Sequence, residues 1–153
     1  MIDMLDVVKR FYYAPAMKGS NSIKKVLPAM LDTSDYLKQK YSQPVYGATG
    51  GIKSHNFKDR AWIVLDTDDN DKVKDPYKAL PRMFTNVPEG VKLLSGTDEL
   101  NDGGAALTAY ARMQFQEMSD YERNELSQAL RNYCELDTMA MVMIYEGWRE
   151  MLK

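Results

Sequence analysis

The feature of this sequence that most constrains its fold is the stretch Tyr121–Lys153, which contains no proline and no glycine before Gly147. Proline and glycine are the residues that disfavour a helix interior most strongly, so a long stretch without them predicts one continuous helix. Ser119 and Glu122 have the spacing of a capping box, in which each side chain bonds the other residue's backbone amide. We expect the helix to begin at this pair.

Shorter helices are predicted in the first quarter of the chain. Asp3–Tyr13 reads as a helix with Asp3 as its N-cap, and Pro15 lies beyond its end. The small polar residues Ser20–Ser22 cap a second helix, which Pro28 is expected to interrupt or kink because proline lacks an amide donor. Asp32–Tyr41 predicts a third helix.

Residues 42–101 differ in character, because they contain four of the six prolines and five of the nine glycines. One short apolar run, Ala61–Leu65, predicts one or two short strands there. Helical periodicity returns at Asp102 and continues to the end of the chain. We therefore expect a single domain over 1–153 that is mainly α with a few short strands. Residues 42–101 would form an irregular, loop-rich insert, and residues 102–153 the helical C-terminal part.

Charge and composition exclude several classes of protein. No apolar stretch approaches the roughly 18 residues of a membrane-spanning helix, so we expect no membrane association. The single cysteine, Cys134, cannot form an internal disulfide, which favours a reducing, cytoplasmic compartment. The net charge is only −2, but residues 1–60 hold ten Lys and Arg against five Asp and Glu. A polyanion would therefore approach the first part of the chain.

Two ligand-binding motifs are nearly present but fail at diagnostic positions. Gly47–Ser54 approaches a phosphate-binding loop, except that Ile52 stands where the second glycine is required. Asp66–Asp71 approaches a calcium loop, but its sixth position is aspartate instead of glycine and its twelfth is Tyr77 instead of glutamate. Both segments are interpreted as turns.

The most informative pair is Tyr133 and Asp137, which lie at i and i+4 of the long helix and so on the same side of it. The run Met139–Ile144 follows, is apolar all round the helix, and is expected to be buried. A carboxylate at the edge of such a run needs a partner. Two interpretations stay open: a structural cap or ion pair, and a functional ligand.

Three segments carry a resemblance to a known family: Phe11–Pro28, Asp102–Leu107 and Tyr133–Val142. Together they resemble a bacterial domain family of unassigned function. That family is usually found at the C-terminal end of larger proteins with a ribonuclease-H-like region of the proofreading-exonuclease type. The similarity covers almost the whole chain and implies the helical C-terminal part of a ribonuclease-H-like α/β fold.

The resemblance implies a function and a set of site residues. Nucleases of that superfamily bind two divalent metals through four acidic residues, and a tyrosine positions the attacking water. Asp137 then matches the last acidic metal ligand and Tyr133 the tyrosine of a 3′–5′ exonuclease-like enzyme. Mg²⁺ or Mn²⁺ would bind only in a complete site. The substrate would be a nucleic acid, with Lys18, Lys24 and Lys25 as phosphate contacts.

The first two acidic motifs of the superfamily are absent from this sequence. Asp120 and Glu122 form its only D-x-E, which a helix first turn explains by capping, and His55–Asp59 resembles the second motif but lies in the irregular region. One carboxylate cannot hold a metal pair. We therefore expect an N-terminally truncated member that is inactive alone and associates with the missing half or with another chain.

A non-catalytic function is the alternative prediction. The C-terminal helix is rich in methionine, at Met139, Met141, Met143 and Met151, and methionine packs adaptably against varied partners. A helical protein-interaction module would use this helix to bind another chain.

Overall fold

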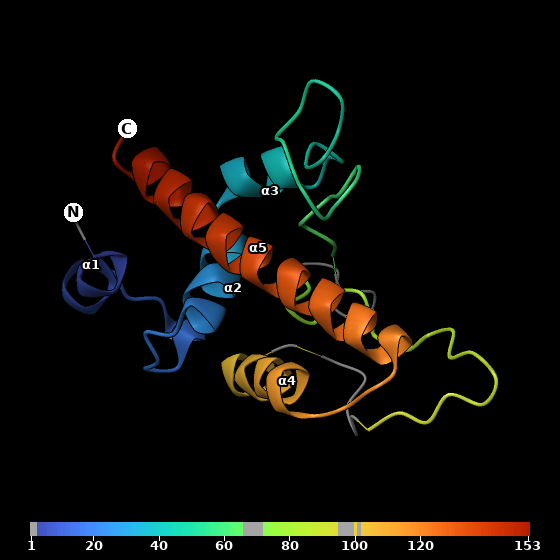
Figure 1. Cartoon of the computed structure of the whole chain (residues 1–153). Helices are drawn as coiled ribbons and strands as arrows, with labels where there is room; N and C mark the ends of the chain where they lie inside the picture. Colours follow the sequence, from blue (N-terminus) through green and yellow to red (C-terminus); the bar gives the residue numbers. More distant parts are fainter. Residues whose placement is uncertain (1–2, 66–71, 95–99, 101) are drawn as a thin grey trace. The chain divides into compact units, whose positions relative to one another are not determined.

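The computed structural model describes residues 3–65, 72–94, 100 and 102–153 (Figure 1). Within these residues the chain is mainly helical, as predicted. The helices are α1 (Met4–Phe11), the 3₁₀ helix η1 (Pro15–Met17), α2 (Ile23–Thr33), α3 (Asp35–Tyr41), α4 (Gly103–Phe115) and α5 (Asp120–Met151). Instead of the short strands that were predicted, the described residues contain isolated bridges that join Tyr46 to Ile52, Tyr46 to Arg60 and Leu65 to Val73.

The chain divides into two compact units. The first comprises Met1–Pro76 and Asp137–Lys153, and the second comprises Tyr77–Leu136. Helix α5 contributes its C-terminal part to the first unit and its N-terminal part to the second. The segment Asp66–Asp71, which was interpreted as a turn, lies outside the described residues.

The core of the first unit is built around α2. Five of its side chains, Val26, Leu27, Ala29, Met30 and Leu31, are almost completely buried. The helix continues through Pro28, so the predicted interruption is wrong. Proline removes one helical hydrogen bond, and burial of the apolar side chains on both sides of it offsets that loss.

Helix α5 crosses α2 and α3 at Gly147. A β-carbon built on this glycine would lie 2.7 Å from the Met30 sulfur and 3.2 Å from Leu37 Cδ1. Those distances are shorter than van der Waals contact, so a larger residue here would require the Met30 and Leu37 side chains to shift. The crossing holds the C-terminal part of α5 against the core of the first unit.

The third predicted helix begins later than expected. It starts at Asp35, with Ser34 as N-cap accepting a hydrogen bond from the Leu37 amide at 3.3 Å. Asp32 belongs to α2 instead, and its carboxylate accepts a hydrogen bond from the Val73 amide at 3.0 Å.

The apolar run that predicted a strand is anchored to the end of α3. The amides of Trp62 and Ile63 both donate to the Tyr41 carbonyl, at 2.9 and 3.0 Å, and both side chains are buried. The Trp62 ring packs against Tyr46, with ring centroids 5.3 Å apart. Because these backbone donors point to a helix end, they are not available to pair with a neighbouring strand.

The second unit contains α4 and the first part of α5. Asp102 caps α4 by accepting from the Ala105 amide at 2.8 Å, and a helix therefore begins where the helical periodicity was predicted to return. Ser119 caps α5 by accepting from the Glu122 amide at 3.2 Å. The Glu122 carboxylate, however, is fully buried and accepts from the Leu94 amide at 3.0 and 3.1 Å. The capping box therefore forms only on the serine side, because a buried carboxylate needs the donor that the loop supplies.

Candidate functional site

Tyr133 lies in the second unit, on α5, and is buried. Its ring is tilted against that of Tyr77, with centroids 5.9 Å apart. A β-carbon built on Gly103 would lie 3.8 Å from the Tyr133 hydroxyl, so the first residue of α4 and this hydroxyl are neighbours. The Asp102–Leu107 and Tyr133–Val142 segments, 26 residues apart at their nearest ends, thus meet at Tyr133.

Asp137 lies one turn after Tyr133 on the same helix and is partly exposed. The 3.6-residue repeat places side chains at i and i+4 on the same side of a helix, so the predicted pairing of phenol and carboxylate follows from α5 itself. The apolar run after Asp137 is only partly buried. Met139 and Met143 are buried, whereas Met141 and Val142 are more than 40% exposed.

The expectation that this run is buried all round is therefore wrong. Helices α2 and α3 contact α5 where Gly147 meets Met30 and Leu37, and they cover that side of the helix. The opposite side carries Met141 and Val142 to the surface of the first unit. Four methionines were predicted to bind a partner. Two of them, Met139 and Met143, are buried in the core of the first unit, whereas Met141 and Met151 are exposed.

A metal centre needs several ligands, and the described residues do not assemble one. No group of three or more His, Cys, Asp or Glu side chains among them is placed to hold a metal ion. The buried Glu122 carboxylate is bonded to the Leu94 amide, and Asp120 is exposed. Asp137 alone does not fit a self-contained Mg²⁺ or Mn²⁺ site, since these hard cations take several oxygen ligands.

The three predicted phosphate contacts, Lys18, Lys24 and Lys25, lie around one turn of the first unit. Lys18 ends η1 in the left-handed backbone region, at φ 51°, and its side chain is exposed. Lys24 and Lys25 are in the first turn of α2, where Lys25 is exposed and Lys24 is partly buried. The N-terminus of a helix carries a positive partial charge, and basic side chains there increase its attraction for anions.

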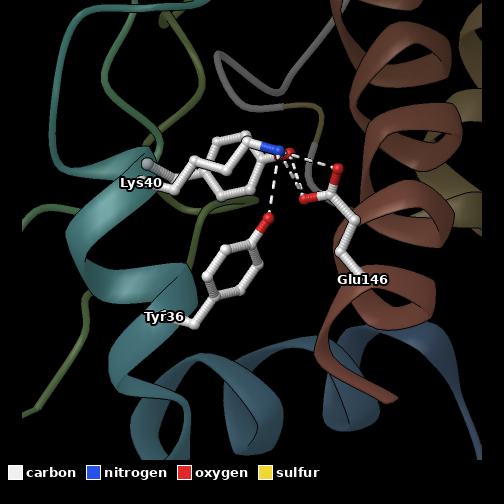
Figure 2. Close-up of polar contacts among 4 residues, drawn as sticks. Tyr36, Lys40 and Glu146 are labelled. Carbon is white, nitrogen blue, oxygen red and sulfur yellow. Dashed lines mark hydrogen bonds and ion pairs between the residues drawn. The ribbon is translucent and has the colours of Figure 1, made fainter. Parts of the chain in front are cut away.

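A polar cluster that sequence reasoning missed joins α3 to α5 (Figure 2). The Lys40 ammonium lies 2.7 and 2.8 Å from the two carboxylate oxygens of Glu146, and 3.5 Å from the Tyr36 hydroxyl. The buried Tyr41 hydroxyl donates to the same carboxylate at 2.8 Å. Lys40 and Glu146 are separated by 106 residues, so no local spacing in the sequence indicates their contact.

The electrostatics of this cluster show what it can do. Burial raises the pKa of Tyr41, and its hydrogen bond to Glu146 raises it further. Burial acts to lower the pKa of Lys40, but the hydrogen bond and charge of Glu146 outweigh it, so the pKa is raised. Both groups therefore stay protonated at neutral pH. A lysine held in this form is not a nucleophile or a general base, and the cluster fastens α3 to α5.

Comparisons with known proteins identify no relative of this chain. The sequence matches no protein-family model, and no curated protein or solved structure shows significant similarity to it. In the described part of the chain, no helix has the length and apolar character needed to cross a membrane.

Proposed function

We propose that this chain is the C-terminal part of a metal-dependent nuclease that hydrolyses phosphodiester bonds in nucleic acid with 3′–5′ exonuclease-like polarity. Asp137 would be one ligand of its divalent metals, and Tyr133 would position the attacking water. This proposal extends the resemblance to the helical C-terminal part of ribonuclease-H-like nucleases.

The observation that carries the proposal is the arrangement of Tyr133. Its hydroxyl lies next to Gly103 at the start of α4, and Asp137 follows it by one helical turn. Two separate segments of the resemblance thus meet at the residue to which the resemblance assigns chemistry. A phenol beside the positive end of one helix is well placed to orient a polar group that carries developing negative charge.

The basic turn supports a nucleic-acid substrate. Lys18, Lys24 and Lys25 gather around the start of α2, and residues 1–60 carry an excess of five positive charges. Lysines contribute to nucleic-acid binding by neutralising phosphates, largely without regard to base sequence. They would therefore set affinity and leave the choice of DNA or RNA to other contacts.

The metal site itself would be completed by carboxylates from another polypeptide segment. Asp137 supplies one oxygen donor group, and a Mg²⁺ or Mn²⁺ pair requires several. The proposal therefore assigns to this chain one metal ligand and one positioning residue. It does not assign to it an independent nuclease activity.

The test is divalent-ion-dependent degradation of 5′-labelled single-stranded DNA and RNA by the complete reading frame that encodes this chain. Loss of a residue that supports a metal ligand lowers activity by up to roughly 100-fold. Asp137→Asn removes a ligand itself, so it should lower the rate by at least that factor. Asp120→Asn, an exposed carboxylate on the same helix, is the matched control and should leave the rate unchanged. Unchanged cleavage by Asp137→Asn would refute the assignment.

A helical protein-interaction module is the second candidate function. It is favoured by the large apolar side chains that the first unit leaves exposed, among them Phe11 at 81% and Leu152 at 87%. Large exposed apolar patches mark interaction surfaces in soluble proteins. Calorimetric titration of the complete reading frame with Mn²⁺ separates the candidates: binding that Asp137→Asn abolishes supports the metal site, and no binding by a folded, self-associating protein supports the module.

A further inference from the structure

An apolar groove of about 500 Å³ opens on the first unit between α1 and the end of α5. Both walls follow the spacing with which helices pack against helices. Residues three and then four positions apart line each wall: Met4, Val7 and Phe11 on α1, and Tyr145 and Trp148 on α5 with Leu152 in the turn that follows it. A groove lined by two such stripes is shaped to receive the apolar side of a third helix.

The rim of this groove exposes side chains that water solvates poorly. Phe11 and Leu152 are more than 80% exposed, and Tyr145 and Met151 are more than half exposed. All four line the groove, so their exposed surfaces are adjacent. Covering them with a partner would contribute favourable free energy in proportion to the apolar area removed from water.

The charges on α1 indicate which partner covers the groove. Asp3 and Asp6 stand at its start and Lys9 and Arg10 in its last turn. The helix period places Asp3 and Arg10 on the same side as Val7, beside the groove, and Asp6 is one turn from Arg10. Two copies of α1 that meet antiparallel therefore bring the acids of each opposite the bases of the other. A surface that complements itself in this way is what a two-fold symmetric interface requires.

We propose that the α1–α5 groove of the first unit binds the same groove of a second copy of this chain, with the two α1 helices antiparallel. Phe11 of each copy would enter the groove of the other, and Asp6 of each would face Arg10 of the other. This inference deepens the interaction-module function and does not depend on the nuclease assignment, which cleavage assays test separately.

Sedimentation velocity of the full chain from about 1 to about 100 µM tests the proposal, a range that covers weak and moderately tight dimers. We expect a concentration-dependent dimer. Phe11→Ser should weaken it at least 10-fold, because it removes the aromatic side chain that would enter the partner's groove. Tyr13→Ser is the matched control, because Tyr13 is similarly exposed but does not line the groove, and it should dimerise like the wild type. A wild-type monomer throughout, or equal effects of the two substitutions, would overturn the proposal.

A charge-reversal experiment tests the antiparallel arrangement itself. Asp6→Arg and Arg10→Asp should each weaken self-association, by about 10-fold, because each places like charges opposite one another at two symmetric positions. A mixture of the two variants should form a heterodimer at least as tight as the wild-type dimer, since every facing pair is again of opposite sign. Circular dichroism controls for the fold. Failure of the mixture to associate would overturn the pairing of Asp6 with Arg10, and a groove covered by a different chain would give that result.

Discussion

Helices α1 and α2 belong to the same compact unit, yet they are held in very different ways. Of the eight residues of α1 only Val8 is buried, whereas five of the eleven residues of α2 are buried. Both helices carry apolar stripes, so composition does not separate them. The difference shows that α2 is part of the core of the first unit, and that the apolar side of α1 is left for another use.

The difference between α1 and α2 is tested most directly by the same leucine-to-alanine truncation in each helix. Leu27→Ala in α2 should lower the free energy of unfolding by about 3 kcal/mol, because it removes a completely buried side chain and leaves a cavity. Leu5→Ala in α1 should lower it by less than about 1 kcal/mol, because Leu5 is 43% exposed. Urea unfolding of both variants measures the difference. Equal losses would mean that α1 is as much a part of the core as α2.

Helix α3 differs from α1 and α2 in having a polar attachment, the hydrogen bond from Tyr41 to Glu146 on α5. Tyr41→Phe removes the buried hydroxyl that donates to Glu146, and a hydrogen bond to a charged group contributes about 1.5–3 kcal/mol. We expect a loss near the lower end of that range, because Lys40 keeps its contacts with Glu146. Tyr36→Phe is the control. Its hydroxyl lies 3.5 Å from the Lys40 ammonium, a weaker contact, and its loss should be several-fold smaller in urea unfolding.

The same cluster predicts how stability depends on alkaline pH. The folded-state pKa values of Lys40 and Tyr41 are raised, so the folded state holds these protons more tightly than the unfolded chain. The stability they contribute is complete below their ordinary pKa values of about 10 and is lost as pH rises through the folded values. Unfolding free energies from pH 8 to pH 11 should fall less steeply in Tyr41→Phe than in the wild type. Parallel curves would show that the Tyr41 hydroxyl does not contribute to this pH dependence.

The smallest effect is expected at the α1 cap. Asp3→Ala removes the side chain that accepts from the Leu5 amide at 2.8 Å, and should cost α1 about 1 kcal/mol of local stability. Hydrogen exchange should therefore quicken in α1 and stay unchanged in α2, because local opening of α1 does not require the core to unfold. Quickened exchange in both helices would show that they open as one unit.

Local chemistry explains which parts of the fold the sequence predicted. Asp3 and Ser119 each cap a helix where they were expected, since a cap depends on residues two or three positions away. Tertiary burial explains the failures. Pro28 stays inside a helix because its neighbours are in the core, and Glu122 turns from its own cap to the Leu94 amide. Neither outcome is encoded within one turn of the chain.

In the candidate site, too, local features could be predicted from the sequence and contacts between distant residues could not. The placement of Tyr133 and Asp137 on one side of a helix follows from the helical period alone. The position of the Tyr133 hydroxyl beside Gly103 depends on how α4 packs within the second unit, and the contact of Lys40 with Glu146 joins residues 106 positions apart. Sequence periodicity carries no information about such distant pairs.

Gly147 has a consequence that goes beyond tight packing. A β-carbon at this position would lie 2.7 Å from the Met30 sulfur, so sliding α5 by one turn, which brings Met143 or Met151 to the crossing, would require the Met30 and Leu37 side chains to move. The glycine therefore favours one register of α5 against α2 and α3. In that register Tyr145 and Leu152 are exposed, so the absence of one β-carbon at the crossing favours the placement of the apolar surface that the first unit offers for recognition.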